Sequence, residues 1–237
     1  MSIIDDIIST AQSENRTYLL ENESKTILQE YKLPITQFKV AVTEDEAVNA
    51  AETIGYPVVL KILSPDVIHK SDVGGVLINI KDADGVRKGY QTIMVNVKKH
   101  KKKAHIKGIF VEEFAPKGIE VIIGAIKDPQ FGPALMFGLG GIFVEVLKDV
   151  SFRVAPITKY DAGEMIKEIK GYPILTGIRG QEPSDLKALK EILLKVSKLV
   201  MDYSIINQLD LNPVFSYSKG AKCVDARIIL EEAMNSQ

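Results

Sequence analysis

A histidine with charged neighbours stands in a polar segment of the chain, residues 64–75. His69 lies between the carboxylates of Asp66 and Asp72, a lysine follows it directly, and the segment ends on two glycines. Imidazole titrates near neutral pH and can act as a nucleophile, and a carboxylate can orient the ring by accepting its other N–H. The segment is therefore either a site that handles phosphate or a solvated turn with an incidental histidine, and taken alone it favours neither.

A lysine interrupts the apolar run of residues 57–62, which is predicted to form a buried strand directly before the histidine segment. Lysine is rarely buried unless it is paired. Lys61 either extends along the strand end to reach water, or it points its ammonium group into a cleft, where it would meet a nucleotide phosphate.

Oxygen-bearing side chains gather on two strands predicted near the C-terminus, residues 205–215 and 223–230. Asp210 and Asn212 share one face of the first strand because side chains alternate along a strand. If the two strands pair, they bring Asp225 close to Asp210 or Asn212. Such a small set of oxygen ligands leaves room for phosphate oxygens and suits Mg²⁺, although Asn212 and the proline after it can also form only a turn that ends a strand.

Two α+β sections must position these residues. The first, residues 36–106, alternates strand, helix, strand, strand and helix. The second begins near residue 108 with three apolar runs at turn spacing, which predict an antiparallel meander. It continues with a glycine-rich stretch at 138–141, where a ligand could approach the backbone closely, and with a long amphipathic helix at 185–203.

Composition excludes several classes of protein. The chain has 237 residues, 46% of them hydrophobic, which is enough for a sizeable core. A net charge of −1 gives no overall field that would attract nucleic acid or an anionic membrane. The single cysteine, Cys223, excludes an internal disulfide and suits a reducing compartment. No apolar run reaches the roughly 18 residues of a membrane span, so we expect a cytoplasmic protein with no membrane or nucleic-acid partner.

Four strings together resemble the β subunit of ADP-forming acetate–CoA ligases, which belong to the succinyl-CoA synthetase superfamily and have the ATP-grasp fold. The strings are residues 59–62, 68–75, 137–149 and 210–213. The resemblance covers nearly the whole chain, and the histidine and glycine strings are specific in combination. The sequence has no Walker A motif and no kinase catalytic-loop signature, which argues against those two classes of phosphate-handling protein.

The resemblance implies an α+β fold with two subdomains that enclose a nucleotide. The smaller subdomain, residues 28–108, is expected to carry Lys61 and the His69 loop as a lid. The larger subdomain is expected to combine residues 1–27 with residues 109–237 and to carry the strands that bind Mg²⁺ and nucleotide.

The resemblance also implies an enzyme of two kinds of subunit, expected as an α₂β₂ assembly. A separate α subunit would bind CoA, convert acetyl-CoA and phosphate to acetyl phosphate, and carry the phosphoryl group on its own histidine. The β subunit would pass this group through His69 to ADP, with Mg²⁺ bound, so that acetate, CoA and ATP are formed. The His69 loop must then move. Succinyl-CoA synthetase β subunits lack this histidine, and the chain beyond Leu230 is too short for their additional C-terminal domain, which favours the acetate type.

The family's functional positions are carried over to matching residues only. His69 is the phosphoryl carrier, and Asp66 or Asp72 would orient it. The nucleotide-binding positions are Lys61, Glu112, Glu113, Phe114, Glu120, Gly140 and Gly141. Arg153, in an apolar run, is an additional candidate for a phosphate contact. The Mg²⁺ positions are Asn212 and Asp225, with Asp210 as a neighbour of open role.

Three other functions stay open at this point. The chain could be the β subunit of a succinyl-CoA synthetase-like enzyme or a regulatory ATP-grasp module that only binds a nucleotide. It could also be a stand-alone carboxylate–amine ligase, which would give His69 no role. The acyl group and the preferred purine nucleotide are not specified by these residues.

Overall fold

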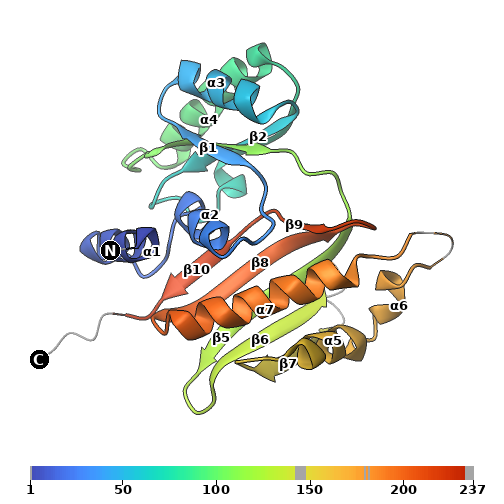
Figure 1. Ribbon diagram of the computed structural model, residues 1–237. Helices are drawn as coiled ribbons and strands as arrows, with labels where there is room; N and C mark the ends of the chain where they lie inside the picture. The colour runs from blue at the N-terminus through green and yellow to red at the C-terminus, as the bar shows by residue number, and fades with distance from the viewer. Residues whose placement is uncertain (1, 142–147, 179, 181, 233–237) are drawn as a thin grey trace, which may run out of the picture. The chain divides into compact units, whose positions relative to one another are not determined.

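The computed structural model describes residues 2–141, 148–178, 180 and 182–232. The chain divides into two compact units, which are described separately (Figure 1). The larger unit combines Met1–Ile35 with Lys117–Gln237, and the smaller unit is Thr36–Pro116. In the described part of the chain, none of the helices has the length and apolar character that crossing a membrane requires.

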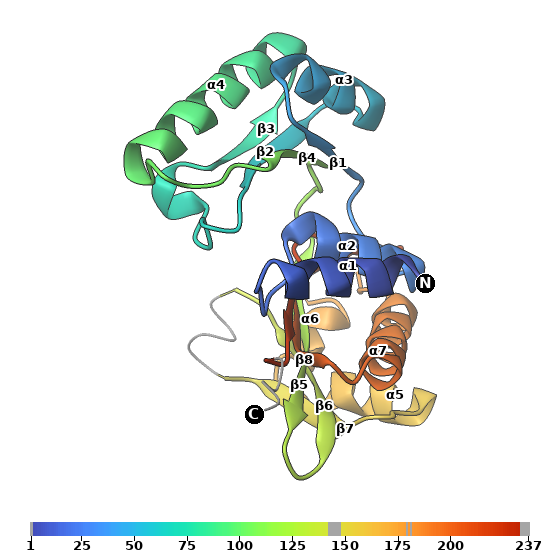
Figure 2. The same ribbon diagram turned by 90° about the vertical axis from the view of Figure 1, so that its left-hand side faces the viewer.

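A four-stranded antiparallel sheet with two helices on one face forms the smaller unit (Figure 2). The strands follow the spatial order β1-β4-β2-β3. A capping box from Thr43 to Glu46 starts the first helix, because the two residues satisfy each other's backbone N–H groups. The elements are β1 (Phe38–Ala41), α3 (Glu44–Ile54), β2 (Val58–Leu63), the 3₁₀ turn η1 (Ser71–Val73), β3 (Val76–Ile80), α4 (Ala83–His100) and β4 (Gly108–Glu113).

The boundaries of the units differ from the expected ones at both ends. The strand β4 pairs with β1 and β2 in the middle of the smaller sheet, so the smaller unit extends to Pro116 instead of residue 108. Residues 28–35 belong to the larger unit because Leu28 and Leu33 are buried in its core, and Ile35 bridges to Cys223. In the sequence β4 is followed by β5 (Ile119–Asp128), but its ladder hydrogen bonds are made with the earlier strands β1 and β2.

The larger unit is a six-stranded antiparallel sheet with the spatial order β10-β8-β5-β6-β7, and β9 pairs with β8. Its meander consists of β5, β6 and β7, one strand later than predicted, because β4 lies in the other sheet. The elements are α1 (Ile3–Ser13), α2 (Glu21–Glu30), β5 (Ile119–Asp128), β6 (Gly132–Leu139), β7 (Val150–Val154), α5 (Lys159–Glu168), α6 (Tyr172–Leu175), α7 (Leu186–Asp202), β8 (Ile206–Ser216), β9 (Ala221–Cys223) and β10 (Arg227–Leu230).

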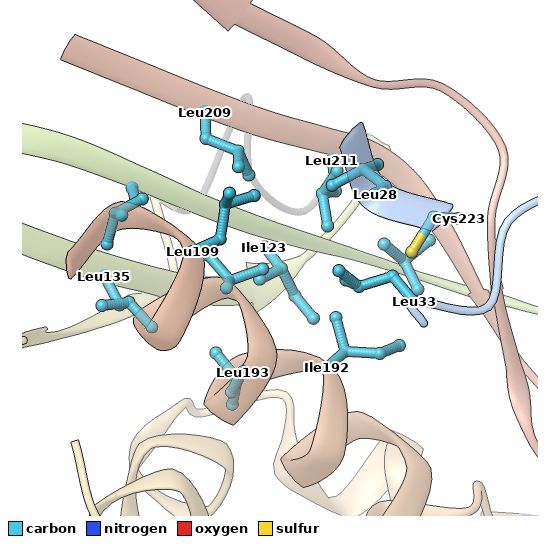
Figure 3. Packing of buried hydrophobic residues seen from close by; sticks show 14 of the residues in the cluster. Leu28, Leu33, Ile123, Leu135, Ile192, Leu193, Leu199, Leu209, Leu211 and Cys223 are labelled. Carbon is cyan, nitrogen blue, oxygen red and sulfur yellow. The ribbon is translucent and has the colours of Figure 1, made fainter. Parts of the chain in front are cut away.

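Helix α7 covers one face of this sheet, and the hydrophobic core of the larger unit includes residues from both (Figure 3). Ile192 and Leu199 from the helix pack with Ile123, Leu135 and Leu209 from three strands. This confirms the amphipathic helix predicted at 185–203. Because side chains alternate along a strand, the neighbouring side chains point to the opposite face of the sheet. That face carries the polar residues of β8.

Candidate functional site

A buried ion pair lies on the sheet face of the smaller unit that points away from its helices. Lys61 stands between Leu60 and Ile62, both fully buried in the core, so its side chain points to the opposite face. Its Nζ lies 2.8 Å from Oε2 of Glu112 on the neighbouring strand, and the two side chains are 12% and 1% exposed. The Thr36 hydroxyl donates to Oε1 of Glu112. Lys61 is therefore a paired, largely buried lysine held at a fixed position.

The end of β4 carries the other residues expected at the nucleotide edge in this unit. Oε2 of Glu113 accepts the backbone N–H of Gln37 at 3.1 Å. The backbone N–H of Phe114 donates to the carbonyl of Pro57, also at 3.1 Å. Both side chains are half-buried. The bonds hold the chain in an extended path where it leaves the sheet, and contact with a nucleotide stays a prediction for both residues.

His69 is exposed on a loop whose two ends are fastened. Val67 and Val73 on either side are buried in the core of the smaller unit. The N–H of Gly75 donates to the Lys70 carbonyl at 2.8 Å, which closes the loop directly after the histidine. The arrangement presents the imidazole to the surroundings on a short, anchored segment.

The two carboxylates predicted to orient His69 are both exposed. Oδ2 of Asp66 accepts the backbone N–H of His105 at 2.6 Å and so ties the loop to the segment before β4. Across the described ranges, neither Asp66 nor Asp72 is hydrogen bonded to His69. Their orienting role stays a prediction.

Gly75 leaves no space for a side chain beside the histidine loop. A methyl group there would lie 2.7 Å from Cγ2 of Ile62 and 2.9 Å from the carbonyl oxygen of Lys70. We expect Gly75→Ala to lower the free energy of unfolding by about 1–3 kcal/mol, measured by urea denaturation, because the backbone of the loop must shift.

The matched control for that substitution is Gly163→Ala in helix α5. A methyl group there would lie 3.3 Å from Nζ of Lys190, the mobile end of a flexible side chain. This variant should keep or gain stability, since alanine is favoured over glycine inside a helix by about 1 kcal/mol. Equal stability of the Gly75→Ala variant and the unmodified chain would show that the loop is not held tightly.

The polar residues of β8 lie on the face of the larger sheet that points away from α7. Leu209 and Leu211 are buried in the core, and Asp210 and Asn212 alternate with them on the other face, as predicted. The single strand predicted at 223–230 is wrong: the chain forms the short strands β9 and β10 with a break at residues 224–226. Asp225 lies in this break.

The break brings Asp225 beside the polar face of β8. The N–H of Val224 donates to the carbonyl of Pro213 at 3.0 Å, so the residue before Asp225 is bonded to the residue after Asn212. Burial and the neighbouring charge of Asp225 raise the pKa of Asp210, and Arg227, its partner in the register of β10, opposes the shift. The two carboxylates are therefore close enough to destabilise each other's charge.

These residues fit a Mg²⁺ ion. A divalent cation would relieve the repulsion between Asp210 and Asp225, and Asn212 would add an amide oxygen. Over the part of the chain that the structure describes, no group of three or more His, Cys, Asp or Glu residues is placed to hold a metal by itself. Mg²⁺ commonly uses one or two carboxylates and completes its coordination with water and substrate phosphates.

Glu120 lies beside Gly140 and Gly141, the two glycines predicted to bind the nucleotide, at the end of β6. The N–H of Gly140 donates to the Glu120 carbonyl at 2.8 Å. A methyl group on Gly141 would lie 3.2 Å from Oε2 of Glu120. Glu120 alternates with the buried Val121, so it lies on the same face of the sheet as Asp210. Residues 142–147 of the glycine string lie outside the described residues.

Arg153 lies apart from the other predicted residues of the larger unit. Its guanidinium group binds both carboxylate oxygens of Glu168 in α5. Ser151, two positions earlier on β7, donates its hydroxyl to the carbonyl of Met165 in the same helix. Arg153 thus faces the helices and Asp210 faces away from them, so the structure gives no geometric support to a shared phosphate contact.

Sequence reasoning missed the buried pair of Glu21 and Lys25 in α2. Their side chains are 2% and 0% exposed, and Nζ of Lys25 lies 3.8 Å from Oε1 of Glu21. The spacing of four residues is the one at which opposite charges meet on a helix. Lys25 also lies three residues before Leu28, on the face that packs into the core. Both signals were present in the sequence.

Comparison with known proteins places the chain among close relatives. The family model of the ATP-grasp domain matches residues 10–230. The β subunit of ADP-forming acetate–CoA ligase I from Pyrococcus furiosus is 55% identical over 225 residues, which are 95% of this chain and 97% of the relative. ADP-forming acetate–CoA ligase I from Archaeoglobus fulgidus is 48% identical over 210 residues, 89% of this chain and 30% of that longer protein.

A solved structure supports the same relationship. Acetyl-coenzyme A synthetase 1 from Ca. Korarchaeum cryptofilum, in complex with coenzyme A and Mg-AMPPCP, is similar with a TM-score of 0.87 and 48% identity. The match covers 96% of this chain and 100% of the other. In that protein a phosphohistidine segment points towards the nucleotide-binding site.

Proposed function

The chain belongs to the ATP-grasp family, among the β subunits of ADP-forming acetate–CoA ligases, and on this premise we propose that it passes a phosphoryl group through His69 to ADP. The observation that carries the proposal is the position of His69, exposed between the buried anchors Val67 and Val73. A carrier must be open to a donor on another protein, and an anchored loop with an exposed tip supports this role.

The transfer consists of two exchanges at phosphorus. In the first, a ring nitrogen of neutral His69 attacks the phosphohistidine of a partner subunit; the P–N bond on the partner breaks as the P–N bond on His69 forms. In the second, a β-phosphate oxygen of ADP attacks, the bond to His69 breaks, and ATP and free imidazole result. The ring nitrogen must carry a free electron pair in the first step, which the neutral form of histidine supplies.

The remaining residues act by position and charge, which supply most of the catalysis in phosphoryl transfer. Lys61 would donate to phosphate oxygens. Glu112, which accepts a hydrogen bond from Thr36, holds the ammonium group of Lys61 in place before the nucleotide arrives. Asn212 and Asp225 would hold Mg²⁺, which supplies positive charge to the phosphates when it is bound.

We propose that the phosphohistidine belongs to a separate α subunit that also binds CoA. The Pyrococcus furiosus relative is named as a β subunit, which implies a second kind of subunit. The Archaeoglobus fulgidus relative is one longer protein, of which this chain spans 30%; it has room for both functions in one chain. We further propose acetyl-CoA as the acyl donor and an α₂β₂ assembly.

Reconstitution with the α subunit tests the proposed function. ATP formation from acetyl-CoA, phosphate and ADP is expected only when both subunits and Mg²⁺ are present. Removal of the metal with EDTA should stop the reaction, and excess Mg²⁺ should restore it. If the chain formed a product from ATP and a carboxylate without the α subunit, it would be a stand-alone ligase. If it bound ADP but never supported ATP formation with the α subunit, it would be a regulatory module.

A further inference from the structure

Helix α2 carries a charge at a position where an apolar side chain would be expected. The Lys25 side chain is fully buried, with Ile27 and Leu28 of the same helix in the core around it. Burying an ammonium group costs several kcal/mol unless it is paired and hydrogen bonded. Glu21 supplies the opposite charge, but a pair of apolar residues would fill this position at no such cost. The pair therefore needs a reason other than filling the core.

The hydrogen bond of Lys25 indicates that reason. Its Nζ donates to the carbonyl of Val224 at 2.6 Å. The ladders that β8 forms with β9 and β10 include residues 221–223 and 227–230, so Val224 lies outside both of these registers. A backbone carbonyl in such a break has to be satisfied by some other donor, and Lys25 reaches it from a helix that is about 200 residues earlier in the sequence.

Both backbone polar groups of Val224 are hydrogen bonded, and both bonds affect the proposed cation site. Its N–H donates to the carbonyl of Pro213, the residue after Asn212, and its carbonyl accepts from Lys25. The next residue is Asp225, whose Oδ1 accepts the N–H of Ala226 at 2.8 Å. With Val224 fixed at both polar groups, the position of the Asp225 carboxylate relative to Asn212 is also fixed.

We propose that Lys25 is a positioning residue for the divalent-cation site: its bond to Val224 holds Asp225 opposite Asn212. This inference rests on the proposed function, which assigns Asn212 and Asp225 to the metal. When a residue that holds a metal ligand in position is replaced, metal affinity typically falls by about 10- to 100-fold. A role in packing alone would change stability and leave metal affinity unchanged.

The test measures Mn²⁺ binding in the presence of ADP by electron paramagnetic resonance, on the full chain with its α subunit. The paired variant Glu21→Gln/Lys25→Met removes both charges of this ion pair together. We expect its Mn²⁺ affinity to fall about 10-fold or more, while the affinity for ADP in EDTA stays unchanged. Mn²⁺ affinity equal to that of the unmodified protein would overturn the proposal.

Two further variants separate positioning from stability. Glu21→Gln/Lys25→Gln keeps an N–H donor for the Val224 carbonyl and should retain more Mn²⁺ affinity than Glu21→Gln/Lys25→Met. An equal loss of Mn²⁺ affinity in both double variants would refute the role of the hydrogen bond. Leu28→Ala, in the same helix, should lower the melting temperature and leave Mn²⁺ affinity unchanged. If Leu28→Ala weakened Mn²⁺ binding as much, the effect would be one of stability, against the proposal.

A second measurement, hydrogen exchange, tests whether Asp225 is held in position. The N–H of Ala226 donates a hydrogen bond to the Asp225 carboxylate. Its exchange should be faster in Glu21→Gln/Lys25→Met than in the unmodified protein, whereas the exchange of the α7 amides should not change. Unchanged exchange would count against the proposal. Asp225→Asn separates the metal assignment from the role of Lys25. If Asp225→Asn lowers Mn²⁺ affinity and Glu21→Gln/Lys25→Met does not, Asp225 remains a metal ligand and the role of Lys25 is refuted. If Asp225→Asn binds Mn²⁺ normally, the metal assignment itself fails.

Discussion

Replacing His69 with alanine is expected to lower ATP formation from acetyl-CoA, phosphate and ADP by a factor of about 10³ or more, with the α subunit present. The imidazole is the nucleophile of the first exchange and the leaving group of the second, and removal of a covalent catalyst leaves only the slow background reaction. The side chain is exposed, so stability and ADP affinity should not change. The measurement is a coupled ATP assay together with ADP binding.

His100→Ala is the matched control for that substitution. His100 is also an exposed histidine of the smaller unit, at the end of α4, where its Nδ1 lies 2.9 Å from the Asn96 carbonyl. This variant should keep full activity. Full activity of His69→Ala in the same assay would rule out the relay, and a loss in both variants would point to a general effect on the subunit.

Lys61→Met is expected to have two large effects. It leaves Glu112 as a buried charge without the Lys61 ammonium, and breaking a buried ion pair in this way costs about 3–5 kcal/mol of unfolding free energy. It also removes the cation proposed to meet the phosphates, so activity should fall by a factor of about 10²–10³. Urea denaturation and the ATP assay measure the two effects separately.

The paired variant Lys61→Met/Glu112→Gln separates these two effects. It removes the charge of Glu112 as well, and the introduced amide can keep a hydrogen bond to the Thr36 hydroxyl. Stability should largely return, because a buried pair can often be replaced as a whole at little cost, whereas activity should stay low. Lys39→Met, at an exposed lysine of β1, should change neither quantity. Recovery of activity along with stability would mean that Lys61 serves only the fold.

The family, the ATP-grasp fold and the class of enzyme were predictable from the sequence and are confirmed. They depend on local strings and on strong periodicity, such as the amphipathic pattern of α7 and the alternation of Asp210 with buried leucines in β8. These features are decided by neighbours in the chain and need no knowledge of distant contacts.

The errors concern contacts between distant segments. The strand β4 belongs to the smaller sheet because of its pairing with β1 and β2, and periodicity carries no information about the partner of a strand. The break around Asp225 depends on two hydrogen bonds of Val224: its carbonyl accepts one from Lys25, and its N–H donates one to the carbonyl of Pro213. The phosphate contact of Arg153 stays a prediction, and the face that its side chain occupies is shown by its pairing with Glu168 in α5, a contact that periodicity does not reveal. The roles of the individual site residues stay predictions.

Labelling with ³²P decides whether His69 carries the phosphoryl group. The protein and its α subunit are incubated with [³²P]phosphate and acetyl-CoA but without ADP, and the two chains are then separated under alkaline conditions. An acid-labile label should be found on this chain at His69, and addition of unlabelled ADP should transfer it to ATP at least as fast as the enzyme turns over. Rapid ATP formation with label on the α subunit alone would show that His69 is not on the path.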